Sequence, residues 1–573
     1  AYNLPYERFE QIVRQVLADR GASTQEMLVS FNPELAPQFM LFDQAAAIEN
    51  LPVNERQSLD ARLREIKVVL IRTLISDQLS YVKIAKDWFT IADLRDIRQR
   101  KIGSGKIGGK AAGMLLAKRI LDEVASQDIR THISIPESYF IGADITYEFL
   151  ALNGLLSWND QKYKDEAQIR SEYAQLQQSF LAGTFPSSAA DELHDLLAHI
   201  GKQPLIVRSS SLLEDNFGTS FAGKYESIFC PNQGTPEENL DDLTCAIQRI
   251  YASVFNPDAL LYRRSKGLLD YDERMAILLQ VVQGEQFGRY YLPHAAGVAF
   301  SHNQYRWAPQ IRRQDGFVRL VWGLGTRAVD RVGNDYPRLV ALSHPLLHPE
   351  ATPEAVRRYS QHYVDVIDLQ DNQFKTLPAA EVLSSRYPPL RYIAQVDEGG
   401  YLSALHTSLV GGDTHQLVLT FDELLRRTPI AARLREMLQL LEEHYRSPVD
   451  TEFTLSIAGT YASQPDVQIH LLQCRPQSHF KEKKAHFPTS LNPADVIFST
   501  RRVVPDGEVA GIRYVLYVTP EGYFAIIEPA QRAALVKAIG LLNAKLDCEC
   551  YICVGPGRWG SNNPDLGVKV GYA

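Results

Sequence analysis

The sequence of 573 residues lacks several features that would place it in a specialised class of protein. It contains no run of about 20 apolar residues, so no membrane-spanning helix is expected. Residues 1–5 show neither the basic nor the apolar region of a signal peptide, which leaves the cytoplasm as the expected compartment. Basic charge is not in excess either: the formal net charge is −8, which argues against broad nucleic-acid binding.

Cysteine is scarce, with six residues in the whole chain. Cys548, Cys550 and Cys553 are closely spaced and could suit a thiolate metal site, but only three ligands lie close together. The segment that holds them has the pattern of a strand leading into a glycine-rich loop. We therefore favour core or half-buried cysteines with reduced thiols.

The composition is that of a soluble globular protein, with 45% hydrophobic and 22% charged residues. A chain of this length exceeds one hydrophobic core and should form three or four domains or lobes.

One segment suited to anion binding follows an apolar run at residues 204–207. The run is expected to be a strand that delivers Arg208 and three serines to a turn, with two carboxylates and a Ser-Phe-Ala-Gly stretch at 220–223 after it. Arginine offers a fork of donors to an anion, and glycine lets the backbone approach a ligand. A salt-bridged loop is the alternative interpretation.

A glycine-rich loop with lysines, residues 103–110, precedes a segment with helical spacing of apolar residues at 111–121. The loop differs from the dinucleotide fingerprint, which follows a buried strand, and from the ATPase P-loop, in which Ser or Thr follows the lysine. A lysine at the start of a helix still favours phosphate binding, because the first N–H groups of the helix and its dipole attract anions. A plain surface loop is the alternative.

Two strands that could form a hairpin follow at 450–455 and 468–476. Side chains alternate along a strand, so Asp450 and Glu452 share a face of the first strand, and Gln473 and Arg475 share a face of the second. Paired in a hairpin, they would set two carboxylates, an amide oxygen and a guanidinium side by side. Such oxygens suit Mg²⁺ on nucleotide phosphates, and the arginine suits a phosphoryl group in transfer. An exposed salt-bridged face is the alternative.

Together these segments resemble the ATP-grasp nucleotide-binding region of the phosphoenolpyruvate synthase and pyruvate phosphate dikinase family. The resemblance covers roughly residues 100–478 and implies an α/β (α+β) fold with two lobes that enclose ATP. Its motifs occur in order along the chain: Gly-Gly-Lys at 108–110, Val-Arg-Ser-Ser at 207–210, Glu-Asp at 214–215, Ser-Phe-Ala-Gly at 220–223, Gly-Leu-Gly at 323–325 and Leu-Gln-x-Arg-Pro at 472–476.

The resemblance implies a role for each matching residue. Lys110, Arg208 and Arg475 would make the catalytic contacts to the phosphates. Asp450, Glu452 and Gln473 would bind Mg²⁺. Gln280 and Val282 would lie at a hinge beside the adenine. The remaining ATP-binding residues would be Gly108, Gly109, Ser209 and Glu214.

The chain also departs from the family pattern. A glutamate commonly follows Gly-Leu-Gly, but this chain has Thr326, and Asp330 or Asp335 could substitute for the missing carboxylate. The family's phospho-histidine domain and phosphoenolpyruvate barrel do not follow the Leu-Gln-x-Arg-Pro motif within the 573 residues. A similar-looking histidine, His415, stands before that motif and is interpreted as a loop residue.

The expected organisation has four parts. They are a helical domain at 1–97, a first ATP-grasp lobe at 98–270, a second lobe at 271–478 and, after a linker, a small α/β module at 494–573. In the module, strands are expected at 514–518 and 523–527, a helix at 532–542, and a Gly-Arg-Trp loop at 555–564 that either binds an anion or forms a rigid turn. The native chain could continue past residue 573.

The leading hypothesis is an ATP- and Mg²⁺-dependent phosphotransferase whose acceptor is a small molecule, a separate protein or a further segment of the chain. The rival is a regulatory or scaffold module that holds ATP without turnover, and an ATP-dependent ligase is a third possibility. Neither a nucleic-acid nor a membrane partner is expected, and an oligomer is compatible with the sequence.

Overall fold

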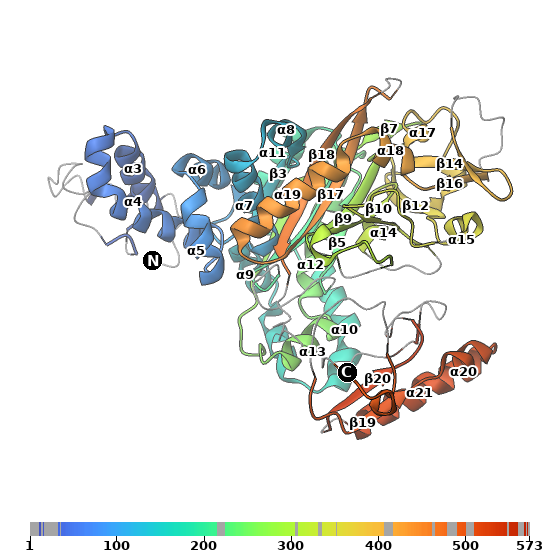
Figure 1. Ribbon diagram of the computed structural model, residues 1–573. Helices are drawn as coiled ribbons and strands as arrows, with labels where there is room; N and C mark the ends of the chain where they lie inside the picture. Colours follow the sequence, from blue (N-terminus) through green and yellow to red (C-terminus); the bar gives the residue numbers. More distant parts are fainter. Residues whose placement is uncertain are drawn as a thin grey trace.

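The computed structural model mixes helices and strands throughout (Figure 1). It describes residues 36–214, 224–303, 307–329, 335–350, 352–405, 416–460, 464–477, 490–499, 509–546 and 549–557, with scattered positions near both ends of the chain. Among the described residues, no helix is both long and apolar enough to cross a membrane.

The N-terminal part is helical, as the spacing of its apolar residues predicts. Its described helices are α3 (Gln38–Glu49), α4 (Val53–Leu74), α5 (Leu79–Trp88) and α6 (Ile91–Gln99). Thr90 caps α6 in a reciprocal pair with Asp93, which fixes where that helix begins. Apolar residues of these helices join one continuous core with α7 (Gly109–Val124) and the larger sheet, so the helices are packed onto the rest of the protein.

A five-stranded sheet forms the centre of the first half of the chain. Its strand order is β1 (Lys101–Ile102), β3 (Ser138–Ile141), β6 (Met275–Val281), β4 (Leu205–Ser211) and β5 (Ser227–Cys230). Its apolar core is shared with α9 (Ala143–Leu152), α10 (Glu166–Leu181), α11 (Ser187–Ile200), α12 (Pro236–Ser253) and α13 (Pro257–Ser265). Because β6 pairs with both β3 and β4, this sheet extends past the boundary expected at residue 270.

A six-stranded sheet forms the centre of the second half. Its order is β11 (Arg338–Ala341), β10 (Phe317–Val321), β9 (Ala295–Phe300), β17 (Val449–Ala458), β18 (Asp466–Pro476) and β2 (Ile133–Ser134). Helices α7 and α19 (Ile430–Tyr445) pack against β17 and β18 (Figure 1). Strand β2 comes from the first half of the chain, so that half also contributes a strand to the six-stranded sheet.

Two smaller sheets lie beside the six-stranded sheet. One has the order β13 (Gln373–Pro378), β12 (Tyr363–Asp368), β8 (Tyr290–Leu292) and β7 (Glu285–Phe287), and the other has β15 (Leu402–Ala404), β14 (Ala394–Asp397) and β16 (Leu417–Leu419). Shorter elements are α8 (Gln127–His132), η1 (Leu155–Tyr163), η2 (Arg313–Asp315), α14 (Thr326–Val329), α15 (Pro353–Arg358), α16 (Ala379–Val382), α17 (Leu390–Ile393), α18 (Asp422–Arg427) and η4 (Pro493–Asp495).

The β12–β13 hairpin reaches back to the first sheet. Phe374 on β13 stacks on Phe229 of β5, with ring centroids 5.4 Å apart and an interplanar angle of 10°. Nearby, the backbone N–H of Gln233 donates to Asn372 Oδ1 at 3.0 Å. These contacts connect the two halves of the chain next to the site described below.

The C-terminal part contains β19 (Tyr514–Tyr517), α20 (Pro520–Ala525), α21 (Pro529–Lys545) and β20 (Tyr551–Val554), with β19 and β20 parallel. The strand predicted at 523–527 is wrong, because α20 occupies most of this segment. Thr519 caps α20 by accepting from the Gly522 N–H, and Pro520 suits a first helical turn. Local capping therefore overrides the aromatic and β-branched composition that favours a strand.

Two further sequence hypotheses concern this part of the chain. Cys550 is exposed and Cys553 is half-buried, and the described residues hold no group of three His, Cys, Asp or Glu side chains placed to bind a metal ion. In the glycine-rich loop, Trp559 packs against the small apolar core formed by Tyr523, Ile539 and Val568. Cys548, Arg558 and residues 560–566 lie outside the described residues, as do Asp215, the Ser-Phe-Ala-Gly stretch, Asp330 and His415.

Candidate functional site

Arg208 connects the two large sheets. The turn expected at this residue is wrong, because β4 continues through Ser211 and keeps Arg208 inside the strand, 6% exposed. Its Nη2 donates to Gln473 Oε1 at 2.7 Å and binds the Glu452 carboxylate, while Nη1 donates to Gln280 Oε1 at 3.3 Å. One guanidinium thus serves acceptors on β17, β18 and β6.

The β17–β18 hairpin has the register that strand alternation predicts. Asp450 lies directly opposite Arg475, and Glu452 lies opposite Gln473. Arg475 binds both carboxylate oxygens of Asp450, with Nε–Oδ1 at 2.6 Å and Nη2–Oδ2 at 2.8 Å. The guanidinium of Arg475 is therefore held in a fixed direction on the face that carries Glu452.

The glycines at the start of α7 allow the helix to approach β4 closely. Gly108 has a positive φ of 82°, and a Cβ there would lie 1.5 Å from the carbonyl oxygen of Ser210. A Cβ on Gly109 would lie 1.9 Å from the carbonyl oxygen of Glu214. The side chain of Ser210 accepts from the Ala111 N–H at 3.2 Å, so it already satisfies one of the first N–H groups of the helix. Both glycines therefore allow the backbone of α7 to pack against the backbone of residues 210 and 214.

This close approach places Lys110 over the end of β4. Lys110 is 8% exposed, and its Nζ donates to Ser209 Oγ at 2.8 Å and to Glu214 Oε1 at 2.7 Å. The ammonium is therefore held by a serine of the Val-Arg-Ser-Ser motif and by the glutamate of the Glu-Asp motif.

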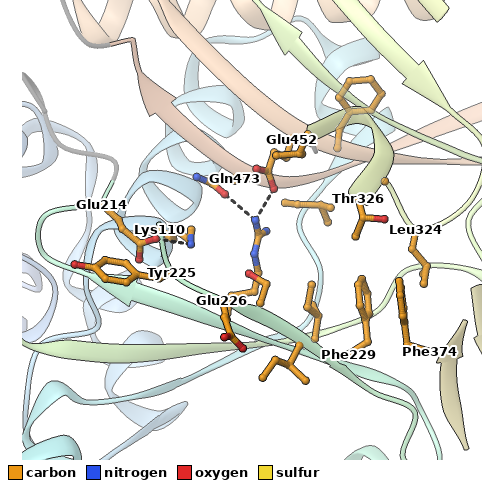
Figure 2. Close-up of a pocket in the computed structure, with 18 of the residues that line it drawn as sticks. Lys110, Glu214, Tyr225, Glu226, Phe229, Leu324, Thr326, Phe374, Glu452 and Gln473 are labelled. Atoms are coloured by element: carbon orange, nitrogen blue, oxygen red, sulfur yellow. Dashed lines mark hydrogen bonds and ion pairs between the residues drawn. The ribbon is translucent and has the colours of Figure 1, made fainter. Parts of the chain in front are cut away.

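These groups line a cavity of about 610 Å³ (Figure 2). Its polar end is lined by Lys110, Arg208, Glu214, Glu452, Gln473 and Arg475. Its apolar end is lined by Ile206, Ile228, Phe229, Leu324, Val329 and Phe374. Figure 2 shows the two phenylalanine rings lying parallel beside Leu324, far from Lys110 and Glu214. A long molecule with a charged end and a flat apolar end matches this arrangement.

Several residues that the sequence assigned to the site do not line the cavity. Gln280 is 1% exposed and donates to the Leu472 carbonyl, in addition to accepting from Arg208. Val282 belongs to an apolar cluster with Leu324 and Ile367. Asp450 reaches the cavity only through Arg475. These three residues therefore contact side chains that line the cavity but do not line it themselves.

The missing carboxylate after Gly-Leu-Gly leaves Thr326 on the cavity wall. Its Oγ1 donates to the buried carboxylate of Asp365, which also accepts from Thr376 Oγ1 at 2.6 Å. Asp335, one of the two residues considered as a substitute, binds Arg327 Nη1 at 2.6 Å and is not among the cavity-lining residues.

Sequence reasoning did not identify Phe229, Phe374 or Thr326 as site residues. Alternation along β5 could have placed Phe229 on one face of a strand. No signal in the sequence brings Phe374 to the site, because its position depends on how the β12–β13 hairpin packs against β5.

The charges around Glu452 decide its ionisation. Burial alone would raise the pKa of this carboxyl, but Arg208, Arg475 and Lys110 together hold the pKa below its ordinary value. Ionised Glu452 and the Gln473 amide oxygen are ligands of the kind that Mg²⁺ takes from a protein when nucleotide phosphates and water supply the others. The donor set thus fits Mg²⁺ together with a bound nucleotide, provided that Arg208 turns from Glu452 toward phosphate.

Comparisons with known proteins agree with this chemistry. The family described as pyruvate phosphate dikinase, AMP/ATP-binding domain, matches residues 104–493. Phosphoenolpyruvate synthase of Escherichia coli (strain K12) is 26% identical over 259 residues, which are 43% of this chain and 28% of that protein. Phosphoenolpyruvate synthase of Neisseria meningitidis serogroup B is 22% identical over 402 residues, 68% of this chain and 42% of that protein. Rifampicin phosphotransferase of Streptomyces sviceus is 26% identical over 217 residues, 37% of this chain and 22% of that protein. The matched regions span less than half of the length of each relative.

Proposed function

The chain belongs to the pyruvate phosphate dikinase AMP/ATP-binding domain family, and from this premise we propose that it binds Mg²⁺-ATP in the cavity and transfers a phosphoryl group. The proposal includes an ATP-grasp arrangement, in which the five-stranded and six-stranded sheets are the centres of the two lobes. The observation that carries it is the convergence of Lys110, Arg208 and Arg475 with Glu452 and Gln473 at one end of a single cavity.

The two ends of the cavity suit the two ends of ATP. Lys110 and Arg208 would neutralise phosphate charge, since both are fixed donors at the polar end. The flat adenine would lie among Ile206, Phe229 and Leu324 at the apolar end, where aromatic and aliphatic side chains favour a planar ring. In this arrangement Gln280 holds Arg208 and does not contact the base.

Phosphoryl transfer would depend on positioning and charge, as in other enzymes of this kind. Glu452 and Gln473 would hold Mg²⁺, which neutralises charge on the phosphate oxygens when bound. Arg475, held by Asp450, would donate to the oxygens of the group in transfer, where negative charge increases in the transition state. The acceptor would be a small molecule, a separate protein or a further segment of the native chain, and the names of the relatives point to different substrates.

A second function, ATP binding without turnover in a regulatory module, is favoured by one observation. Thr326 stands where the family pattern has a carboxylate, and its hydroxyl is committed to Asp365. One fewer acid at the cavity wall would weaken metal binding while leaving the basic side chains in place.

Analysis of nucleotide products distinguishes these functions. The protein is incubated with Mg²⁺-ATP, with and without a cell extract as a source of acceptors, and the nucleotides are separated. AMP with phosphate would support dikinase chemistry, ADP would indicate single phosphoryl transfer or hydrolysis, and unchanged bound ATP would favour the regulatory module. Failure of the protein to bind ATP at all would contradict both functions.

A further inference from the structure

Both carboxylate oxygens of Glu214 already accept hydrogen bonds from the protein, although the residue lines the cavity. Glu214 lies at the end of the turn that follows β4 and is 2% exposed. Its Oε1 accepts from Lys110 Nζ at 2.7 Å and from Ser209 Oγ at 3.0 Å, and its Oε2 accepts from the Ser211 N–H at 3.0 Å. Its own N–H donates to Ser211 Oγ at 3.2 Å, which fixes the backbone from which the carboxylate extends.

The other cavity glutamate is placed differently. The side chain of Glu452 is 24% exposed, and its only side-chain hydrogen bond among the described residues is to Arg208. That carboxylate can exchange Arg208 for a metal ion by turning within the cavity. Glu214 would have to give up three hydrogen bonds in a buried environment, which is costly for a charged group.

A buried lysine needs such a partner. Its long side chain has many rotamers, and its ammonium is expensive to bury without an opposite charge. Ser209 and Glu214 remove this freedom, because together they hold Nζ at one point at the edge of the cavity. The remaining donor direction of the ammonium is then available to an anion in the cavity.

We infer that Glu214 is a positioning residue that holds the Lys110 ammonium in place for phosphate and does not itself bind the nucleotide. This inference rests on the proposed function. It replaces the direct ATP contact that the sequence resemblance implies for Glu214. It also explains why Gly109 is needed, since a side chain there would collide with the Glu214 carbonyl and displace the carboxylate.

A double-mutant cycle tests the inference. The affinity for a non-hydrolysable ATP analogue with Mg²⁺ is measured by calorimetry for the wild type, Glu214→Gln, Lys110→Met and the double variant. The amide must turn a donor toward either Lys110 or the Ser211 N–H, so Glu214→Gln should weaken binding about tenfold, as expected for one charge-assisted contact of about 1.4 kcal/mol. In the Lys110→Met background the same substitution should have no further effect.

Two additional variants separate positioning from folding. Glu214→Asp keeps the charge and should recover part of the lost affinity. Glu423→Gln removes another buried carboxylate, which binds Arg426 and Arg427 away from the cavity, and should leave the affinity unchanged. Unfolding midpoints are recorded for every variant.

Three results would overturn the inference: wild-type affinity in Glu214→Gln, equal losses with and without Lys110, or no recovery in Glu214→Asp. Absence of binding by the wild-type protein is a different outcome, because it would contradict the proposed function itself.

Discussion

The guanidinium of Arg208 on β4 binds Glu452 on β17, and this ion pair joins the five-stranded sheet to the six-stranded sheet. In the proposed nucleotide complex, phosphate would compete with Glu452 for Arg208, and Mg²⁺ would compete with Arg208 for Glu452. Binding of both together would satisfy each charge again, so under this proposal the same residues connect the sheets without ATP and hold Mg²⁺-ATP when it is bound.

Replacing Glu452 should therefore change how ATP affinity depends on Mg²⁺. Glu452→Gln removes a charged metal ligand, so we expect the Mg²⁺ concentration required for half-maximal ATP binding to rise about tenfold or more. Binding of ATP in EDTA should stay the same or strengthen, because Arg208 loses its competing carboxylate. Calorimetric titrations with and without Mg²⁺ measure both effects. Glu226→Gln, elsewhere on the cavity wall, is the control, and an equal shift in that variant would contradict a specific metal role.

Arg475 should matter for turnover more than for binding. Its guanidinium is fixed by Asp450 at the polar end of the cavity, where charge would develop on the group in transfer. We expect Arg475→Ala to lower kcat by about 10²–10³-fold, with only a modest loss of ATP affinity. Single-turnover rates and equilibrium binding are compared in one preparation.

Arg249→Ala provides the matched control for Arg475. Arg249 also lines the cavity, but it is half-exposed and pairs with Glu226 at 3.5 Å. Its replacement should leave kcat within a few-fold of the wild type, as expected for a solvent-screened pair. Unchanged turnover in Arg475→Ala would refute the transition-state role.

Local patterns in the sequence predict the parts of the site, and tertiary packing decides what each part does. Alternation of side chains along β17 and β18 correctly places Glu452 and Gln473 on one face, because strand geometry has a fixed period. The packing of Gly108 against Ser210 is not visible in the sequence, since glycine-rich loops before helices are equally compatible with phosphate binding. The pairing of β2 with β18 in the six-stranded sheet also depends on non-local contacts that local patterns do not encode.

The same close packing continues one turn further along α7. A Cβ on Gly113 would lie 2.0 Å from the backbone carbonyl oxygen of Cys474 on β18, one residue before Arg475. Gly113→Ala should therefore push α7 away from β18 and lower the free energy of unfolding by about 1–3 kcal/mol. It should also weaken ATP binding, because Lys110 and Arg475 are carried by these two elements.

Urea unfolding followed by tryptophan fluorescence measures the stability change of Gly113→Ala. Gly540→Ala on α21 is the control, since a Cβ there meets no atom within 4 Å. In an unobstructed helix interior that substitution should be neutral or stabilising by up to about 1 kcal/mol. Equal changes in the free energy of unfolding for the two alanine variants would show that α7 does not pack tightly against β18.

Glu273 gives the protein a pH-dependent loss of stability. Burial, with a smaller contribution from nearby Glu214, raises the pKa of this carboxyl from 4.5 to about 7, against the opposing effects of Ser211 and Arg263. Between these two values the folded protein holds a proton that the unfolded chain has released. The free energy of unfolding therefore falls as the pH rises from 4.5 to about 7, by about 3 kcal/mol in total, and the loss persists above that range.

Glu273→Gln should remove this loss, because the amide stays neutral at every pH. The variant should match the wild type near pH 4.5 and exceed its free energy of unfolding by up to about 3 kcal/mol at pH 8. Urea unfolding at both pH values measures the difference, with Glu55→Gln on the exposed face of α4 as a control that should keep the wild-type profile. A Glu273→Gln variant whose advantage is the same at both pH values would contradict the raised pKa, since only a group that titrates between them can produce a pH-dependent difference.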